Sequence, residues 1–228
     1  MSNIVQLPAD FYFELENTAR QFTEPLPGRL DPPGHMCPLG PEFRIVSSSS
    51  LAGDNDFADV RCAWSSTGLA FVVDYPAPKK PGPGLVKFNI WLDTRNTRNI
   101  HRATRFCHQF RLEFDPTVLI GRTRAANETM APGAELSQIR INRALADAPV
   151  APRESIFTDC RQHGSGGFRL ALFFTAKALN GYDPEVNSLL GLAYRLQLPN
   201  NDLQRLGAGP EFPTPEDPSL WTTLRLEK

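Results

Sequence analysis

Two neighbouring segments of the chain, 86–93 and 106–114, alternate strictly between apolar and other residues. The first puts four apolar side chains on one face of an extended strand and four others on the opposite face: Val86, Phe88, Ile90 and Leu92 against Lys87, Asn89, Trp91 and Asp93. The second alternates in the same way, with one face formed by Phe106, His108, Phe110, Leu112 and Phe114. A period of two residues predicts two β-strands, each with one face in a hydrophobic core.

The connection between these two strands is polar. Residues 94–105 contain four arginines, two asparagines and one histidine. A polar loop at the end of a rigid sheet is a common position for binding residues. We therefore predict that this loop and the adjoining strand end carry the functional site.

Short strand-like segments continue along most of the chain. A hairpin is predicted where segment 59–64 turns through 65–68, with Gly68 in the turn, into segment 69–74. Further strands are predicted at 11–16, 43–46, 134–141, 156–162, 168–174, 190–198 and 220–226, and one helical turn at 175–179. Two Pro/Gly-rich segments, 25–41 and 76–83, are predicted to be long loops because proline cannot donate to a strand ladder.

This pattern predicts an all-β chain that forms a single antiparallel β-sandwich. We expect one domain over residues 1–228, in which 1–57 supplies N-terminal strands and a Pro-rich loop and 58–226 forms the sandwich core.

The charge balance limits the possible functions. The chain has 24 Lys and Arg against 25 Asp and Glu, whereas general nucleic-acid binding needs a basic surface. The first residues lack the basic and apolar regions of a signal peptide, and no apolar run is long enough to span a bilayer. We therefore expect a cytoplasmic protein without membrane contact, whose four cysteines stay thiols in a reducing compartment.

Several segments resemble the family 9 carbohydrate-binding modules and the related DOMON-like sandwiches. They are the hairpin 60–71, the strand that ends in 91–94, the block 168–174 with its continuation 178–184, and the closing segment 217–224. Residues 101–108 also resemble a segment of planctomycete proteins of this type. The resemblance spans roughly 58–226 and implies a jelly-roll-like sandwich with a non-catalytic binding role.

In such modules aromatic side chains sandwich a sugar, and polar side chains contact its hydroxyl groups. The resemblance therefore implies a site for a carbohydrate or an anionic small ligand, in which Trp91 stacks on the ligand. Polar neighbours at the end of the sheet are expected to complete this site: Asn89, Asp93, Arg95, Arg98, His101 and Arg102.

The alternative is a structural or assembly protein whose Arg-rich and Pro-rich loops form a protein–protein interface. The two hypotheses differ in what they predict for Trp91. A ligand site predicts a concave pocket with Trp91 partly exposed, and an interface predicts a flat apolar patch with Trp91 buried.

The spacing of the loop arginines has two interpretations. Arg95, Arg98, Arg102 and Arg105 are three, four and three residues apart, so in a helical turn they would share one face and could bind a carboxylate or a phosphate. In the second interpretation they pair with Asp and Glu side chains of neighbouring loops and hold the loop in place.

Histidines and cysteines occur in short groups without the spacing of a known metal motif: His35–Cys37, His101, Cys107–His108 and Cys160–His163. Neighbours in a strand face opposite sides, so His108 is expected to be a hydrogen-bonded core histidine and Cys107 a small buried thiol. A Cys–His nucleophilic pair is the catalytic alternative. Asp54, Asp56 and Asp59 lack the distal Glu of a calcium loop, and no axial haem partner can be named for Met36 or Met130. No catalytic residue and no cofactor is assigned.

Overall fold

A computed structural model describes residues 15–23, 39–75, 84–116, 133–163 and 167–228. The strands in chain order are β1 (Glu16–Gln21), β2 (Asp59–Ser65), β3 (Gly68–Tyr75), β4 (Val86–Asp93), β5 (Cys107–Phe114), β6 (Ala134–Gln138), β7 (Ile156–His163), β8 (Gly167–Thr175), β9 (Leu189–Gln197), β10 (Leu203–Leu206) and β11 (Thr222–Glu227). Four short 3-10 turns accompany them: η1 (Pro41–Phe43), η2 (Ser49–Ala52), η3 (Arg153–Ser155) and η4 (Pro218–Leu220). These ranges contain no α-helix, and the all-β prediction is confirmed.

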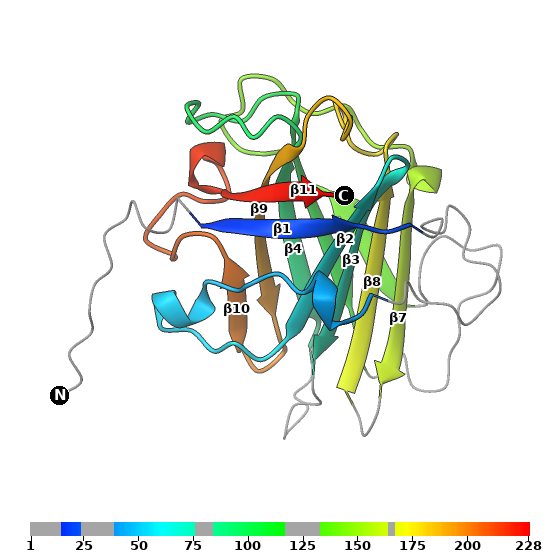
Figure 1. Cartoon of the computed structure of the whole chain (residues 1–228). Coiled ribbons are helices and arrows are strands. Elements are labelled where there is room, and N and C mark those ends of the chain that lie inside the picture. Colours follow the sequence, from blue (N-terminus) through cyan, green and yellow to red (C-terminus); the bar gives the residue numbers. More distant parts are fainter. Residues whose placement is uncertain (1–14, 24–38, 76–83, 117–132, 164–166) are drawn as a thin grey trace.

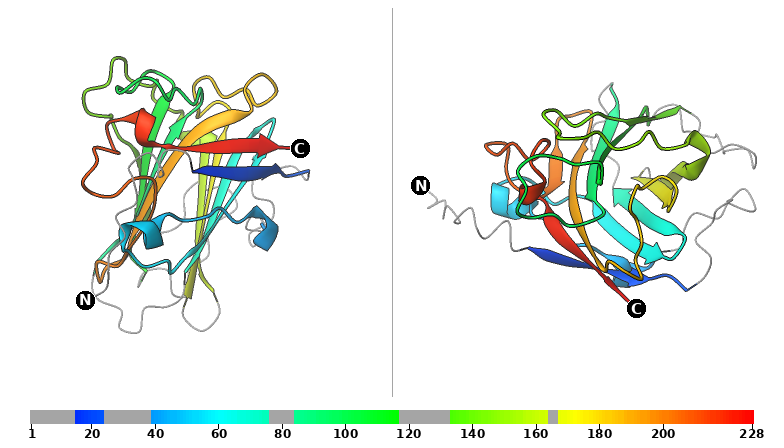
Figure 2. Two further views of the ribbon diagram at one scale, coloured as in Figure 1. Left: turned by 60° about the vertical axis from the view of Figure 1, so that its left-hand side comes forward. Right: turned by 90° about the horizontal axis from the view of Figure 1, so that it is seen from above.

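The strands form one continuous sheet that curves until its two ends face each other (Figures 1 and 2). Their order is β6-β5-β4-β9-β11-β1-β2-β3-β8-β7, and β10 pairs with β9 beside β11. A pocket of about 470 Å³ lies at the seam, lined by β6 and by Ile156 at the start of β7. The two layers of the predicted sandwich are therefore halves of a single sheet, because β11 and β1 join them.

Strand β1 departs from the predicted antiparallel pairing. It lies between β11 and β2 and runs parallel to both. This position sits at the change of direction in the sheet, where β1 and β11 cross in front of the other strands in Figure 1.

Several predicted elements differ in the structure. In the predicted strand 43–46, Phe43 ends η1, and the only pairing is an isolated bridge between Arg44 and Arg61. In the predicted helical turn 175–179, Thr175 ends β8 and the following residues form turns. The predicted strand at 11–16 reaches β1 only at Glu16, and most of that segment lies outside the described residues, as do most of the Pro/Gly-rich segments 25–41 and 76–83. Strand β10 was not predicted.

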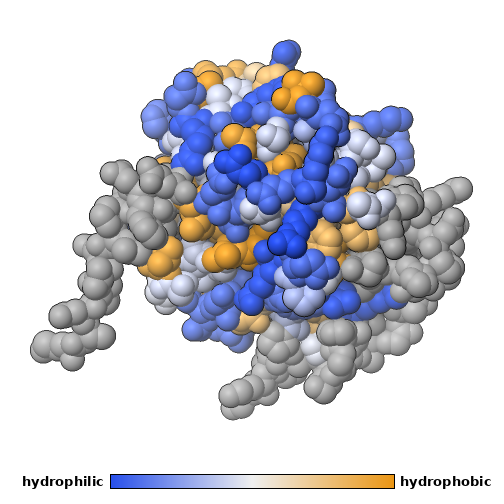
Figure 3. Space-filling view, in the orientation of Figure 1, coloured by the Kyte–Doolittle hydropathy of each residue, from blue (hydrophilic) through white to orange (hydrophobic). Residues whose placement is uncertain are grey.

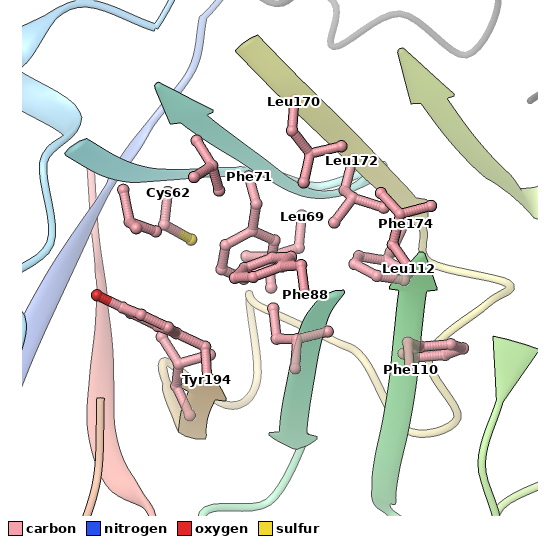
Figure 4. Close-up of a cluster of buried hydrophobic side chains, with 14 of the residues drawn as sticks. Cys62, Leu69, Phe71, Phe88, Phe110, Leu112, Leu170, Leu172, Phe174 and Tyr194 are labelled. Carbon is pink, nitrogen blue, oxygen red and sulfur yellow. The ribbon is translucent and has the colours of Figure 1, made fainter. Parts of the chain in front are cut away.

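The apolar faces of the strands meet inside the curved sheet and form one large core. The predicted inward face of β4 is confirmed, since Val86, Phe88, Ile90 and Leu92 are all buried in this core. Aromatic side chains from five different strands point toward one another there (Figure 4): Phe71, Phe88, Phe110, Phe174 and Tyr194. Burying each such side chain contributes about 1.5–3 kcal/mol, so the core supplies much of the driving force for folding.

The hairpin between β2 and β3 is confirmed, and Gly68 at its turn has a packing role. A Cβ atom at Gly68 would lie 2.1 Å from the carbonyl oxygen of Phe174 on β8. We expect Gly68→Ala to lower the free energy of unfolding by more than about 2 kcal/mol, because the backbone of β8 must move away. Urea unfolding followed by circular dichroism measures this change.

Gly53→Ala is the matched control for that experiment. Gly53 has φ +76° and open space around its Cβ position, so its substitution costs only the left-handed backbone strain of about 1–2 kcal/mol. A Gly68→Ala effect smaller than that of Gly53→Ala would show that β3 and β8 tolerate the added methyl group.

Candidate functional site

Strand β4 carries the predicted site residues on its outer face. It lies between β5 and β9, near the middle of the half of the sheet that runs from β6 to β10. Asn89 and Trp91 point away from the main core, as their alternation predicts. Side chains of the neighbouring strands therefore lie beside both residues.

An arginine row crosses this outer face at the level of Asn89. The backbone register places Arg111 of β5, Asn89 of β4, Arg195 of β9 and Arg205 of β10 side by side. Arg111 Nε donates to Asn89 Oδ1 at 2.9 Å, and Arg205 Nε lies 2.5 Å from Asp54 Oδ2. Arg195 is exposed, and its guanidinium has no hydrogen-bond or ion-pair partner among the described residues.

Trp91 lies next to this row, in a small second core on the outer face. This core consists of Trp91, Ala103, Cys107, Ile141, Ala193 and Trp221. The Trp221 indole N–H donates to the Thr214 carbonyl at 2.7 Å and so ties the segment 207–217 to the sheet. Trp91 is only 5% exposed, so it is not the partly exposed stacking surface that the ligand hypothesis predicts.

A pocket of about 130 Å³ opens beside Trp91. Its walls include Trp91, Arg195, Arg205, Phe212 and Thr214. Three of the lining residues have a buried polar atom without a hydrogen-bond partner among the described residues: Trp91 Nε1, Thr214 Oγ1 and Arg205 Nε. The last of these lies 2.5 Å from Asp54 Oδ2, whereas the first two have no such counter-charge. Such orphaned groups are uncommon and call for a bound partner, because each one otherwise costs about 1–3 kcal/mol. We refer to this site as the Trp91 pocket.

A second pocket, of about 250 Å³, lies on the β5–β6 side of the same face. It is lined by Cys107, Gln109 and the segment 138–150. Gln109 pairs with Trp91 across the strands, so the two pockets flank one strip of the sheet. The outer face is therefore hollowed on both sides of Trp91.

Asp93 and Arg98 hold the loop instead of facing a ligand. Asp93 is 1% exposed, and its carboxylate accepts hydrogen bonds from the backbone N–H groups of Arg95 at 2.9 Å and Thr97 at 2.6 Å. Arg98 Nη1 donates to Thr223 Oγ1 of β11 at 2.9 Å. These bonds fix the turn after β4 and occupy the polar atoms that were expected to contact a ligand.

The exposed side chains of His101 and Arg102 attach the same loop to its neighbours. His101 Nδ1 lies 3.2 Å from Asp217 Oδ2 and 3.0 Å from Ser219 Oγ. The Asp217 and Ser219 oxygens thus contact the same ring nitrogen. In a catalytic triad the histidine binds the carboxylate with one ring nitrogen and the nucleophile with the other, so these three residues do not form a triad. Arg102 Nε donates to the Arg143 carbonyl at 2.7 Å.

The four loop arginines do not share one face. Residues 94–106 form turns and bends instead of a helix, so the spacing of three and four residues does not place the arginines on one face. Arg95 and Arg105 both lie over the Phe106 ring, at 5.1 and 5.0 Å from its centre, while Arg98 and Arg102 have the separate partners given above. None of the four lies within ion-pair distance of a carboxylate in the described part of the chain, so the predicted pairing with Asp and Glu is not seen there either.

Cys107 and His108 face opposite sides of β5, as predicted. Burial raises the pKa of the Cys107 thiol to about 12, which opposes thiolate chemistry, and the nearby Asp93 acts in the same direction. His108 is fully buried and stacks on Phe110, with ring centres 5.9 Å apart. Its ring nitrogens have no side-chain partner, and burial lowers its pKa to about 4, which the backbone of Asn180 partly opposes.

The other metal and nucleophile candidates do not come together either. No three His, Cys, Asp or Glu side chains in the described ranges are placed to hold a metal ion. Asp54 and Asp59 form ion pairs with arginines, and Cys160 is a buried thiol whose pKa is raised by burial. His35, Met36, Cys37 and Met130 lie outside the described residues, as does the side chain of His163.

The surface features give mixed support to the interface hypothesis. The burial of Trp91 agrees with it. However, the exposed large apolar side chains of the described residues come from separate segments: Val46, Leu85, Leu145, Val150 and Val186. On the face shown in Figure 3, the apolar groups among the coloured residues are small and lie between hydrophilic ones. In the same ranges, no helix has the length and apolar character needed to cross a membrane.

The fold belongs to a known architecture. No family model and no curated protein matches the sequence. Among solved structures, the chain is similar to a family 9 carbohydrate binding module from Caldicellulosiruptor kristjanssonii in complex with cellotriose, with a TM-score of 0.53 and 10% identity over 93% of this chain and 94% of that one. A family 9 module from the same organism in complex with glucose has a TM-score of 0.46 and 11% identity over 75% and 76%. At such identity the first likeness establishes a fold like that of family 9 modules, as the sequence resemblance implied.

Sequence reasoning missed Arg111, Arg195, Arg205, Phe212 and Thr214. Period-two alternation correctly puts Arg111 opposite the apolar face of β5, and the same rule puts Arg195 opposite Tyr194 on β9. The local pattern does not give the register between strands, and it is the register that places these arginines side by side.

Proposed function

We propose that this protein is a non-catalytic carbohydrate-binding module and that the sugar binds in the Trp91 pocket. The observation that carries the proposal is a pair of buried, unpartnered polar atoms, Trp91 Nε1 and Thr214 Oγ1, that belong to two residues lining one pocket. A sugar hydroxyl can accept from the indole N–H and exchange a hydrogen bond with the threonine hydroxyl.

The rest of the pocket suits a small polar ligand with apolar faces. Phe212 offers an aromatic surface for the C–H face of a sugar ring, and Arg195 offers free donors at the rim. A volume of about 130 Å³ is small for a binding pocket, so it suits one sugar unit better than a long chain segment. The first structural neighbour was solved with cellotriose, which supports the same ligand class.

Of the residues predicted from the sequence, Trp91 lines the proposed site, and Asn89 lies beside it as the cross-strand neighbour of Arg195. Arg95, His101 and Arg102 surround the end of the sheet, and Asp93 and Arg98 shape its loop. The DOMON-like and planctomycete resemblances, and the extent of the domain as residues 1–228, stay part of this proposal and rest on the sequence segments alone.

Isothermal titration calorimetry with glucose, cellotriose and other neutral sugars tests this function. We expect saturable binding that Phe212→Ala weakens about tenfold or more, because the stacking surface is lost. Trp91→Phe keeps an aromatic ring but removes the unpartnered donor, and should weaken binding by up to about tenfold.

Phe43→Ala is the matched control, since Phe43 is also half-buried but packs against Phe22 on the outer face of the other half of the sheet. It should leave the affinity unchanged. Absence of binding to every sugar of the panel by the folded wild-type protein would overturn the proposal.

A further inference from the structure

We propose that the preferred ligand is an acidic sugar, whose carboxylate binds the arginine row at Arg195. This inference rests on the proposed function and names the ligand class of the same site.

Three guanidinium groups lie in one row across four strands. With strands about 4.8 Å apart, the row from Arg111 through Asn89 and Arg195 to Arg205 spans about 14 Å. Arg195 and Arg205 are directly opposite each other in an antiparallel pair. Like charges in this position repel each other, so the arrangement costs stability unless an anion is present.

The protein itself supplies little negative charge to this row. Asp54 compensates Arg205, at 2.5 Å, and Arg111 is bonded to the neutral Asn89. In the neighbouring row, Lys87 and Glu113 pair with each other at 3.3 Å. Glu135 lies opposite Glu113 on β6, at the end of the row away from Arg195.

Glu211 is the acidic group on the segment that borders the pocket. It is exposed, and its carboxylate lies against Gly209, about where a Cβ of that residue would be. Glu211 makes no hydrogen bond or ion pair with Arg195, so the guanidinium of Arg195 keeps all its donors free among the described residues.

The hydrogen-bonding groups of the site are mostly donors. Arg195 and the Trp91 indole can only donate, and the amide oxygen of Asn89 is already occupied by Arg111. Only Thr214 offers both functions. A neutral sugar needs acceptors for its hydroxyl protons, whereas a carboxylate is a pure acceptor and fits a guanidinium in a bidentate way.

Charge and shape together favour a uronate unit over a simple anion. The pocket lining beside the arginine row also contains apolar groups, among them Pro210 and the ring of Phe212, that a sugar ring can contact. Acetate or phosphate would use Arg195 but leave Trp91 Nε1 and Thr214 Oγ1 without a partner.

Calorimetry with glucuronate, its methyl ester, glucose and acetate tests the inference on the full chain. We expect glucuronate to bind roughly tenfold tighter than glucose or the methyl ester, and to lose this advantage as the salt concentration rises. Arg195→Gln should abolish the preference, so that glucuronate and glucose bind this variant equally. Arg225→Gln is the matched control, because Arg225 is paired with Glu16 at 2.6 Å on β11 and β1; it should keep the preference.

Three other outcomes for the wild-type protein would contradict one or both proposals. Equal binding of glucuronate and glucose would overturn the inference and leave the proposed function intact. Acetate binding as tight as glucuronate would mark a simple anion site and overturn the sugar class. No binding of any sugar would overturn the proposed function itself.

Discussion

Replacing Trp221 with alanine is expected to lower the free energy of unfolding by about 3–5 kcal/mol and to abolish sugar binding. Trp221 is fully buried in the small outer core beside Trp91, and its N–H holds the Thr214 carbonyl at 2.7 Å. Without the indole, the segment 207–217 loses the hydrogen bond that ties Thr214 to the sheet, and the wall of the Trp91 pocket that carries Phe212 and Thr214 loses its support. Urea unfolding and calorimetry on the same samples measure both effects.

Trp64→Ala is the control that separates stability from binding. Trp64 is equally buried and also donates to a backbone carbonyl, that of Glu227 at 2.9 Å, but it belongs to the main core. We expect a similar loss of stability with the affinity retained, at a temperature where both variants stay folded. If Trp221→Ala bound sugar as well as Trp64→Ala does, the segment 207–217 would not form the site.

Acidification is expected to destabilise the protein through His108. Burial lowers the pKa of His108 from its ordinary 6.5 to about 4 in the folded protein. The unfolded chain therefore binds this proton at higher pH than the folded one does, so stability falls as the pH drops below about 6.5 and levels off below about 4. The total loss over this range is about 3 kcal/mol.

Urea midpoints measured across this pH range in wild type and His108→Leu test the assignment. The variant has no titrating group at this position of the core, so its curve should lack the His108 contribution. Identical slopes in wild type and His108→Leu would contradict the prediction.

Local alternation was sufficient to predict much of the sheet. The apolar stripes on 86–93 and 106–114 correspond to β4 and β5, and the hairpin at 59–74 corresponds to β2 and β3. The parallel position of β1 between β11 and β2 could not be predicted in this way, because it depends on pairing between residues some 200 positions apart, such as Glu16 and Thr223. Strand β10 is only four residues long, too short to show a period.

For the candidate site, the sequence predicted the face of the strand but not the burial or the neighbours of its residues. The period of two residues placed Trp91 and Asn89 on the outer face of β4. It carried no information about which other side chains pack on that face. Trp91 is buried because Ile141 and Trp221, which are distant in sequence, pack against the same face. The arginine row depends on strand register, and the spacing of Arg95 to Arg105 suggested a helix that the turns of this loop exclude.

The placement of β1 also constrains when the protein can fold during synthesis. Only Arg20 and Gln21 pair with β2, whereas Glu16 to Arg20 pair with β11. On the ribosome, β2, β3, β7 and β8 can associate once residue 175 has emerged, but β1 lacks its main neighbour until residues 222–227 leave the exit tunnel. The nascent chain therefore exposes open strand edges until β11 is available. The pairing of β1 with β11, which joins the two halves of the sheet, is a late, long-range and slow step.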